Sequence, residues 1–388
     1  MESVFNTVKV NHNYKFHLWL PDIFAFKGGI QVYSAFLLQA IQNIYPEAEH
    51  SVFLKHDRAL ADHLYLPNTN FHFAGKIPLS LRTPFFAAQL IANGTVQKPD
   101  LVITSHLNFA VAAYWLKRLT GIPYITIVHG VEAWNITHLQ RQKALQHADK
   151  ILAVSNYTRE RLLTEQNLDP NKVSLLPNTF NSDRFSIKPK PSYLLKRHQL
   201  QPNQPVILTV NRLSSKESYR GYDRIIEALP QIKQHIPNVH YIIVGKGDDR
   251  ERLEKSIRQQ NLQDCVTLAG FIDDRELPAY YQLCDLFAMP SKLEGFGIVY
   301  LEALASGKPV LGGDRDGAID ALCQGELGVL VNPDDVNEIA NKIIAILQKK
   351  HSHPLIYEPK KLREKVIQKF STLQFEKQLA KQLSVLLK

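Results

Sequence analysis

The chain has 388 residues, of which 45% are hydrophobic and 21% are charged, and its formal net charge is +9. This composition excludes a wholly disordered chain, and the length predicts two domains that each have a hydrophobic core. The first segment lacks the pattern of a secretory signal, and no run of about 18 apolar residues follows, so we expect no membrane-spanning helix.

The distribution of charge limits the classes of ligand, and the cysteines indicate the cellular compartment. Lys and Arg are scattered along both halves of the chain, so nucleic acid is not an expected partner. The positive excess leaves a nucleotide, an acidic acceptor or an anionic membrane surface open as ligands. Cys265, Cys284 and Cys323 form no CxxC motif, which favours reduced thiols and a cytoplasmic protein, with association at the cytoplasmic face of a membrane left open.

Short β-branched runs alternate with longer segments of helical periodicity along the whole chain. In the first half the runs occupy residues 14–20, 100–106, 123–130, 150–155 and 173–177. In the second half they occupy residues 205–210, 239–245, 265–270, 285–290, 309–313 and 328–331. Apolar runs separated by helices predict parallel strands in βαβ units, and therefore an α/β fold with two doubly wound domains.

The same pattern predicts where the domains begin and end. We expect a first domain over residues 1–186, a connector rich in Pro, Lys and Gln over 187–204, and a second domain over 205–370. The closing segment, residues 371–388, places Phe375, Leu379, Leu383 and Leu386 at helical spacing. Its apolar stripe needs another surface to cover.

The most informative segment, "SKLEGFGIVYLEALASGKPV", covers residues 291–310 and follows a predicted strand. Gly295 and Gly297 flank Phe296 where the next helix begins, and unpaired N–H groups at such a helix start form an anion site that glycines leave accessible. Glu302 lies inside the helix, where a carboxylate can accept hydrogen bonds from ribose hydroxyls, and Glu294 in the loop can reach a sugar. Two solvated surface acids remain the alternative.

Cations follow the first strand of the same domain directly. The segment "NRLSSKESYRGYDRIIEAL" contains Arg212, Lys216 and Arg220 ahead of a helix predicted from about Tyr222. Arg offers a planar fork of donors to phosphate oxygens. A solvated surface charge is the alternative for any one of these residues.

These segments together resemble the retaining GT-B glycosyltransferases of glycosyltransferase family 4. Residues 290–310 resemble the family's E-x7-E motif, and the resemblance covers nearly all of residues 205–340. In the first half it continues at "FKGGIQVY", "IVHGVEAW", "ADKILAVSNYTRERL" and "LLPNTFNSDRF". The order and spacing of the pieces make the resemblance specific.

The resemblance implies a GT-B fold, in which two Rossmann-like domains face each other across a cleft and the C-terminal helix returns to the first domain. It also implies a metal-independent enzyme without a cofactor, which moves a hexose from a UDP- or GDP-sugar to a glycan, lipid-linked or small-molecule acceptor with retention of configuration. The alternative is a catalytically degenerate subunit that binds a nucleotide sugar or serves assembly.

Residue roles follow from the same resemblance. His129 and Glu294 are expected to face the donor sugar as catalytic residues, and Glu302 to hold the ribose. The remaining donor-binding candidates are Gly28, Gly29, Arg212, Lys216, Arg220, Gly270, Phe271, Ile272, Gly295, Phe296, Gly297 and Ile298. Of these, Gly270, Phe271 and Ile272 would line the nucleobase slot, and the others would surround the diphosphate. His106 is a candidate on the acceptor side.

Three features depart from the family pattern or compete with it. The family has Lys where this chain has Arg220, so either Arg220 or Lys216 would contact phosphate. Thr179 replaces the glycine of the family's "PNG" turn, which predicts a different turn because Thr adopts positive φ poorly. Asp314 and Asp316 could form a metal-binding DxD pair, but that motif belongs to a fold with one nucleotide-binding domain, so no metal is expected.

Overall fold

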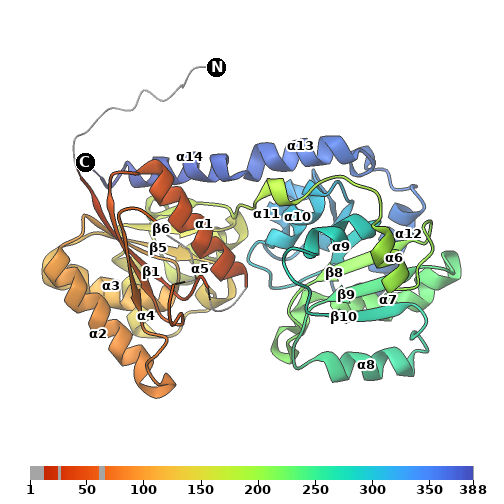
Figure 1. Ribbon diagram of the computed structural model, residues 1–388, viewed down its shortest axis with the longest axis horizontal. Helices are drawn as coiled ribbons and strands as arrows, with labels where there is room; N and C mark the ends of the chain where they lie inside the picture. The colour runs from red at the N-terminus through yellow and green to blue at the C-terminus, as the bar shows by residue number, and fades with distance from the viewer. Residues whose placement is uncertain (1–12, 25–27, 61–65, 388) are drawn as a thin grey trace.

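The computed structural model describes residues 13–24, 28–60 and 66–387 of the chain. They form two lobes, each built on a parallel sheet with helices on both faces (Figure 1). The sheet of the first domain has the strand order β3-β2-β1-β4-β5-β6-β7, and that of the second has the order β10-β9-β8-β11-β12-β13. The prediction of two doubly wound α/β domains is confirmed.

The strands of the first domain include all five predicted runs and two that the sequence pattern did not reveal. They are β1 (Lys15–Leu20), β2 (Glu49–Leu54), β3 (Thr69–Phe73), β4 (Leu101–Thr104), β5 (Tyr124–Val128), β6 (Lys150–Ala153) and β7 (Val173–Leu175). The helices around them are α1 (Gly29–Ile44), α2 (Leu79–Gln97), α3 (Leu107–Thr120), α4 (Leu139–Gln146) and α5 (Asn156–Gln166).

The second domain follows its predicted pattern closely. Its strands are β8 (Val206–Val210), β9 (His240–Val244), β10 (Val266–Gly270), β11 (Leu286–Met289), β12 (Val310–Gly313) and β13 (Val329–Val331). Its helices are α7 (Tyr222–His235), α8 (Arg250–Gln259), α9 (Leu277–Leu283), α10 (Ile298–Ala305), α11 (Ala318–Ala321), α12 (Val336–Leu347) and α13 (Pro359–Phe370). Strands such as β11 are buried on both faces, which explains their continuous apolar sequence.

The strand order reverses direction between β1 and β4 in one sheet and between β8 and β11 in the other. Loops at the carboxyl ends of strands on either side of such a switch point leave a crevice, which is where open α/β sheets bind ligands. The predicted site segments follow β5, β8 and β11, so the topology places them at these ends.

The connector between the domains contains a short helix, α6 (Ser192–Arg197), which its irregular composition did not predict. Leu194 is buried, and Arg197 forms an ion pair with Glu276 at 2.7 Å. Lys190 pairs with Asp285 at 2.6 Å. The connector is therefore fastened to the second domain.

The closing segment forms α14 (Thr372–Leu383), which packs on α1 of the first domain. The rings of Phe375 and Tyr33 lie 5.5 Å apart, edge to face, and Asn43 donates a hydrogen bond to Glu376 at 2.7 Å. Figure 1 shows α13 on the second lobe and α14 on the first. The return of the C-terminal helix to the first domain is confirmed.

Thr179 lies where the chain leaves the first domain, beside the point where it returns. Its hydroxyl donates to the backbone oxygen of Phe370 at 2.8 Å, and Phe180 forms a parallel bridge with Ser371. Thr179 is not among the described residues with positive φ. Thr179 therefore avoids the left-handed conformation, and its hydroxyl links the two chain crossings.

Within the part of the chain that the structure describes, no helix is both long enough and apolar enough to cross a membrane.

The contact between α14 and α1 generates a stability prediction. Phe375 is buried against Tyr33, so Phe375→Ala should lower the free energy of unfolding by about 3–5 kcal/mol, because it leaves a cavity. Thermal and denaturant unfolding would measure the change. Lys377→Ala on the exposed face of the same helix is the control; equal melting of the two variants would contradict the packing role.

Candidate functional site

The loop between β11 and α10 carries most of the predicted donor-binding residues. Phe296 is 1% exposed and packs edge to face on Phe370, which holds the loop against the second domain. Gly297 has a φ of 90°, and a Cβ there would lie 2.5 Å from the Tyr300 ring. No described side chain caps α10. The first N–H groups of α10, from Ile298 onward, therefore face an open helix end.

Asp316 anchors the loop between β11 and α10 through hydrogen bonds. Its carboxylate is fully buried and accepts hydrogen bonds from the Ser291 hydroxyl at 2.7 Å, the Glu294 amide at 2.7 Å and the Ala318 amide at 2.9 Å. Burial raises the pKa of Asp316 to about 7, although these three donors act in the opposite direction. Asp314, by contrast, keeps 43% of its side chain exposed beside Arg315. The two acids of the DxD pattern thus lie in different environments.

Glu217 organises the cations that follow β8. It accepts from Arg212 at 2.7 Å and from Arg220 at 2.9 Å. Arg220 also binds Glu294 at 2.5 Å. Burial opposes the charge of Arg220, but Glu294 and Glu217 outweigh it and hold its pKa above the ordinary value. Lys216 lies on the exposed surface and has no ion pair in the described part of the chain, so the structure brings Arg220 and not Lys216 to Glu294.

The predicted ribose and nucleobase residues lie within α10 and at the end of β10. Glu302 in α10 accepts a hydrogen bond from the Tyr281 hydroxyl at 2.7 Å, and burial raises its pKa to about 7. Gly270 has a φ of 76° and ends β10, with Phe271 59% exposed directly after it. Ile272 packs against the core. Phe271 therefore lies on the surface of the second domain, where the Lys246 ammonium lies 5.0 Å from the centre of its ring.

His129 follows β5 in the first domain and is locked from three sides. Its Nε2 donates to the Ser105 oxygen at 2.9 Å, its backbone amide donates to Glu132 at 2.5 Å, and its ring meets Tyr33 edge on at 4.8 Å. Burial lowers the pKa of His129 to about 4, so the ring is neutral at pH 7. A carbonyl can only accept, so Nε2 carries the proton and Nδ1 can accept a hydrogen bond from a ligand hydroxyl.

Gly28 and Gly29 lie at the start of α1. Gly29 has open space where a Cβ would be, and among the described residues no side chain caps this helix. The two preceding residues of the "FKGG" motif, Phe26 and Lys27, lie outside the described residues.

The two domains touch at glycines of these loops. A Cβ on Gly295 would lie 1.7 Å from the His129 oxygen, and a Cβ on Gly130 would lie 2.8 Å from the Gly295 Cα. A Cβ on Gly317 would lie 2.1 Å from the Gly295 oxygen. Only residues without a side chain allow this approach. The contact brings the backbones around His129 and Glu294 together from opposite domains.

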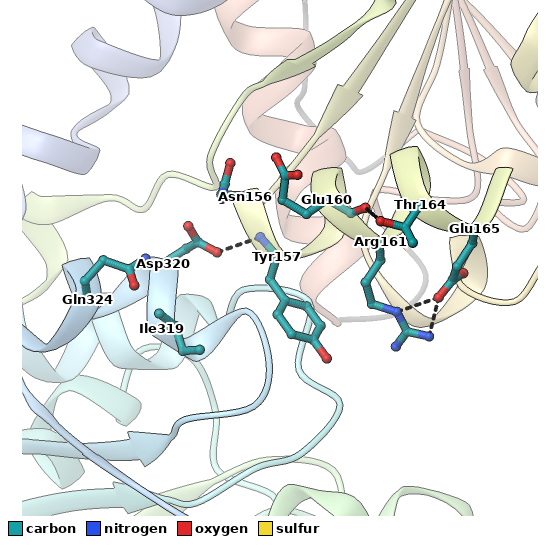
Figure 2. Close-up of a pocket in the computed structure, with 9 residues that line it drawn as sticks. All are labelled: Asn156, Tyr157, Glu160, Arg161, Thr164, Glu165, Ile319, Asp320 and Gln324. Atoms are coloured by element: carbon teal, nitrogen blue, oxygen red, sulfur yellow. Dashed lines mark hydrogen bonds and ion pairs between the residues drawn. The ribbon is translucent and has the colours of Figure 1, made fainter. Parts of the chain in front are cut away.

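A separate hollow of about 400 Å³ lies between the two domains along α5 and α11 (Figure 2). The backbone amide of Tyr157 donates to Asp320 across it at 3.0 Å. None of the predicted donor-binding residues is among its lining residues, which are Asn156, Tyr157, Glu160, Arg161, Thr164, Glu165, Ile319, Asp320 and Gln324. This hollow is therefore distinct from the predicted site.

Sequence reasoning missed the residues that hold the predicted ones in place. Glu217, Tyr281 and Ser105 each contact one or more candidates, yet nothing in the residue type or spacing of Tyr281 and Ser105 marks them. Glu217 does lie inside the basic segment after β8, so its alternation with Arg212 and Arg220 is the one available signal.

The buried position of Asp316 generates a second prediction. Asp316→Ala should lower the unfolding free energy by about 2–4 kcal/mol, because it leaves buried donors without an acceptor. Asp314→Ala is the matched control two residues away and should change stability by less than about 0.5 kcal/mol. Urea unfolding monitored by far-UV circular dichroism would compare them, and an equal loss in both variants would argue against the anchoring role.

Two family models match the chain. The model described as Glycosyltransferase Family 4 matches residues 28–184, and the one described as Glycosyl transferases group 1 matches residues 194–369. The boundary between them falls in the connector.

Curated relatives match part of the chain. A GDP-mannose-dependent alpha-(1-6)-phosphatidylinositol monomannoside mannosyltransferase of Mycobacterium tuberculosis is 30% identical over 242 residues, which are 59% of this chain and 62% of the relative. The alpha-D-kanosaminyltransferase of Streptomyces kanamyceticus is 25% identical, with 60% of this chain and 64% of that protein covered. The match thus spans less than two thirds of the length of these relatives.

Solved structures share the whole fold. HepE of Anabaena in complex with UDP and glucose has a TM-score of 0.78 at 21% identity, covering 96% of this chain and 100% of that one. Sucrose-phosphate synthase of Thermosynechococcus elongatus has a TM-score of 0.78 at 23% identity, covering 96% and 99%. The two parallel-sheet domains, the fold shared with these structures and the two family models all indicate the same family. The chain belongs to the GT-B glycosyltransferases, with a first domain of glycosyltransferase family 4 and a second of glycosyl transferases group 1.

Proposed function

We propose that this glycosyltransferase is a retaining, metal-independent enzyme that moves a hexose from a UDP- or GDP-sugar to an acceptor hydroxyl. The observation that carries the proposal is the glycine contact between the domains, which sets His129 opposite the loop of Glu294. The M. tuberculosis relative is named for its dependence on GDP-mannose, and HepE was solved with UDP-glucose. Both support a nucleotide sugar as the donor here.

The donor diphosphate would lie at the start of α10, with Arg212 and Arg220 beside it and the start of α1 across the cleft. In the free chain Glu217 and Glu294 already balance the charge of these two arginines. A diphosphate that binds Arg220 would therefore displace Glu294, and the freed carboxylate could accept hydrogen bonds from the sugar hydroxyls. Binding of the diphosphate to Arg220 would therefore be coupled to the alignment of Glu294 with the sugar.

Transfer would then depend on position and charge rather than on a protein nucleophile. The departing phosphate oxygen takes the proton of the acceptor hydroxyl on the face where that hydroxyl attacks the sugar. The N–H groups of Ile298 and its neighbours and the arginines stabilise the leaving diphosphate. His129, neutral and fixed by Ser105 and Tyr33, holds a sugar hydroxyl through Nδ1.

Donor screening with a chelator tests this proposal. Candidate UDP- and GDP-sugars are tested for protein stabilisation and then for sugar transfer to an acceptor mixture. Because cationic side chains and a helix start already face the leaving group, activity in excess EDTA should stay within about a factor of two. Loss of activity in EDTA with recovery on adding manganese would overturn metal independence, and donor binding without any transfer would favour the degenerate binding subunit.

The half-buried carboxylate of Glu302 gives the proposal a pH signature. Its pKa of about 7 means that half of the free protein carries a neutral carboxyl near pH 7, whereas two ribose hydroxyls need the ionised form as acceptor. Donor affinity should thus fall about tenfold between pH 8 and pH 6. Calorimetry would measure the change. The ligand should be a nucleotide sugar, because the terminal phosphate of a free nucleotide itself titrates near pH 6 and would add its own pH dependence.

Glu302→Gln is the control for this titration. It should bind the donor more weakly than the wild type at pH 8, and its affinity should not change between pH 8 and pH 6. An unaltered pH dependence in Glu302→Gln would place the titrating group elsewhere.

A further inference from the structure

A group of basic side chains gathers at the carboxyl edge of the first sheet, beyond His129. Lys55 follows β2 directly, His106 follows β4 and caps α3, and Arg141 lies on α4. The strands β2, β1, β4 and β5 are consecutive in the sheet, so the residues that follow β2, β4 and β5 share one edge. We call Lys55, His106 and Arg141 the basic group.

The cations of the basic group, Lys55 and Arg141, have no counter-ion among the residues that the structure describes. Lys55 and Arg141 are half-buried, and neither side chain has a hydrogen bond or an ion pair within the described part of the chain. Two half-buried arginines elsewhere do have acidic partners: Arg220 binds two carboxylates and Arg161 binds Glu165. Half-buried cations lose hydration, and an unpaired one costs stability unless an anion is supplied.

Glu132 and Arg82 also act on the basic group, but both already have other partners. Glu132, which faces His106, already accepts from the His129 amide. Arg82 lies next to Lys55 and is fixed by hydrogen bonds to the backbone oxygens of Gly75 and Ile77. Burial, together with the smaller influences of His129, Arg141 and Lys55, lowers the pKa of His106 to about 4, although Glu132 acts in the opposite direction. Lys55 and Arg141 are therefore both close enough to His106 to influence its charge, so the three side chains lie around one site.

The donor diphosphate is not the anion that fits here. Its proposed contacts are the start of α10 and the arginines after β8 in the second domain, with Gly28 and Gly29 after β1 across the cleft. The basic group follows other strands and reaches His129 from the first domain alone. The start of α3, a helix of 14 residues, adds partial positive charge at the same edge.

We propose that the acceptor carries a phosphoryl group and that Lys55, His106 and Arg141 bind it, which places an acceptor hydroxyl in front of His129. This inference rests on the proposed transferase function and names the class of its second substrate. The guanidinium of Arg141 offers a planar pair of donors to phosphate oxygens, and Lys55 adds a mobile point charge. The phosphoryl group could belong to a soluble sugar phosphate or to a lipid-linked diphosphate.

The test compares anion binding in matched variants of the full chain. Hexose 6-phosphate and the unphosphorylated hexose are titrated against the wild type, Arg141→Gln, Lys55→Gln and Lys143→Gln, with melting temperature as the readout. Lys143 lies on the same helix as Arg141 but is exposed, so its variant removes an equal charge outside the basic group. Vesicles of phosphatidylcholine with and without a polyprenyl diphosphate form the second arm, read by co-sedimentation.

We expect the phosphorylated probe of one arm to bind and its unphosphorylated counterpart not to bind. Arg141→Gln and Lys55→Gln should each weaken that binding at least about tenfold, and Lys143→Gln should leave it unchanged. The arm that responds identifies a soluble or a lipid-linked acceptor. Binding of neither probe, or equal binding by Arg141→Gln and Lys143→Gln, would overturn the proposal.

Donor binding measured on the same samples separates this inference from the function on which it rests. UDP- and GDP-sugars should bind all four proteins alike, because the basic group lies apart from the donor residues. If no nucleotide sugar bound the wild type while the phosphorylated probe still depended on Arg141, the transferase proposal would fail and the anion site would stand.

Discussion

The arrangement of the cleft depends on one steric condition, the absence of side chains where the two domains meet. Gly295 and Gly130 let the backbone of the second domain lie against the His129 oxygen, and Gly317 lets a second loop lie against Gly295. Each of these approaches would place a Cβ inside the radius of a backbone atom. Because His129 and Glu294 flank this contact, the distance between the two halves of the site is set by backbone atoms, which vary less than side-chain rotamers do.

Electrostatic balance around that contact explains how charged groups are kept ready without a ligand. Arg212 and Arg220 alternate with Glu217 and Glu294 in a network whose formal charge is zero. Such a network lowers the cost of holding Arg220 half-buried, whereas Arg212 stays exposed. On the first domain no similar partners surround Lys55 and Arg141 within the described residues. The two sides of the cleft therefore differ. The arginines of the second domain already have acidic partners, whereas Lys55 and Arg141 of the first domain have none among the described residues.

Much of this could be predicted from the sequence, and the exceptions have physical causes. The continuous apolar runs identified the strands buried on both faces. The runs at β2 and β3 escaped because "EHSVFL" and "TNFHF" mix polar with apolar residues, and β3 lies at the sheet edge. Helix α6 escaped because it is short and is held by Leu194 and by ion pairs to the second domain.

The environment of individual acids was beyond sequence reasoning. Asp314 and Asp316 look alike in the sequence, but one is solvated and the other is buried beneath the Glu294 loop. Likewise, residue type left Lys216 and Arg220 equal, and only the fold turns Arg220 toward Glu294. Where a side chain points depends on the turn that carries it, here the short helix Ser215–Arg220, and such turns are set by contacts distant in sequence.

The paired chain crossings near Thr179 have a mechanical consequence. The outgoing and returning segments are tied by the Thr179 hydroxyl and the bridge from Phe180 to Ser371, and Phe370 at this point also touches Phe296. Two adjacent, linked crossings form a hinge line, about which one lobe can turn against the other. Displacement in such a rotation grows with distance from the line. In such a rotation the donor loop, anchored beside the line through Phe296, would move least, and the outer rims of the lobes would move farthest.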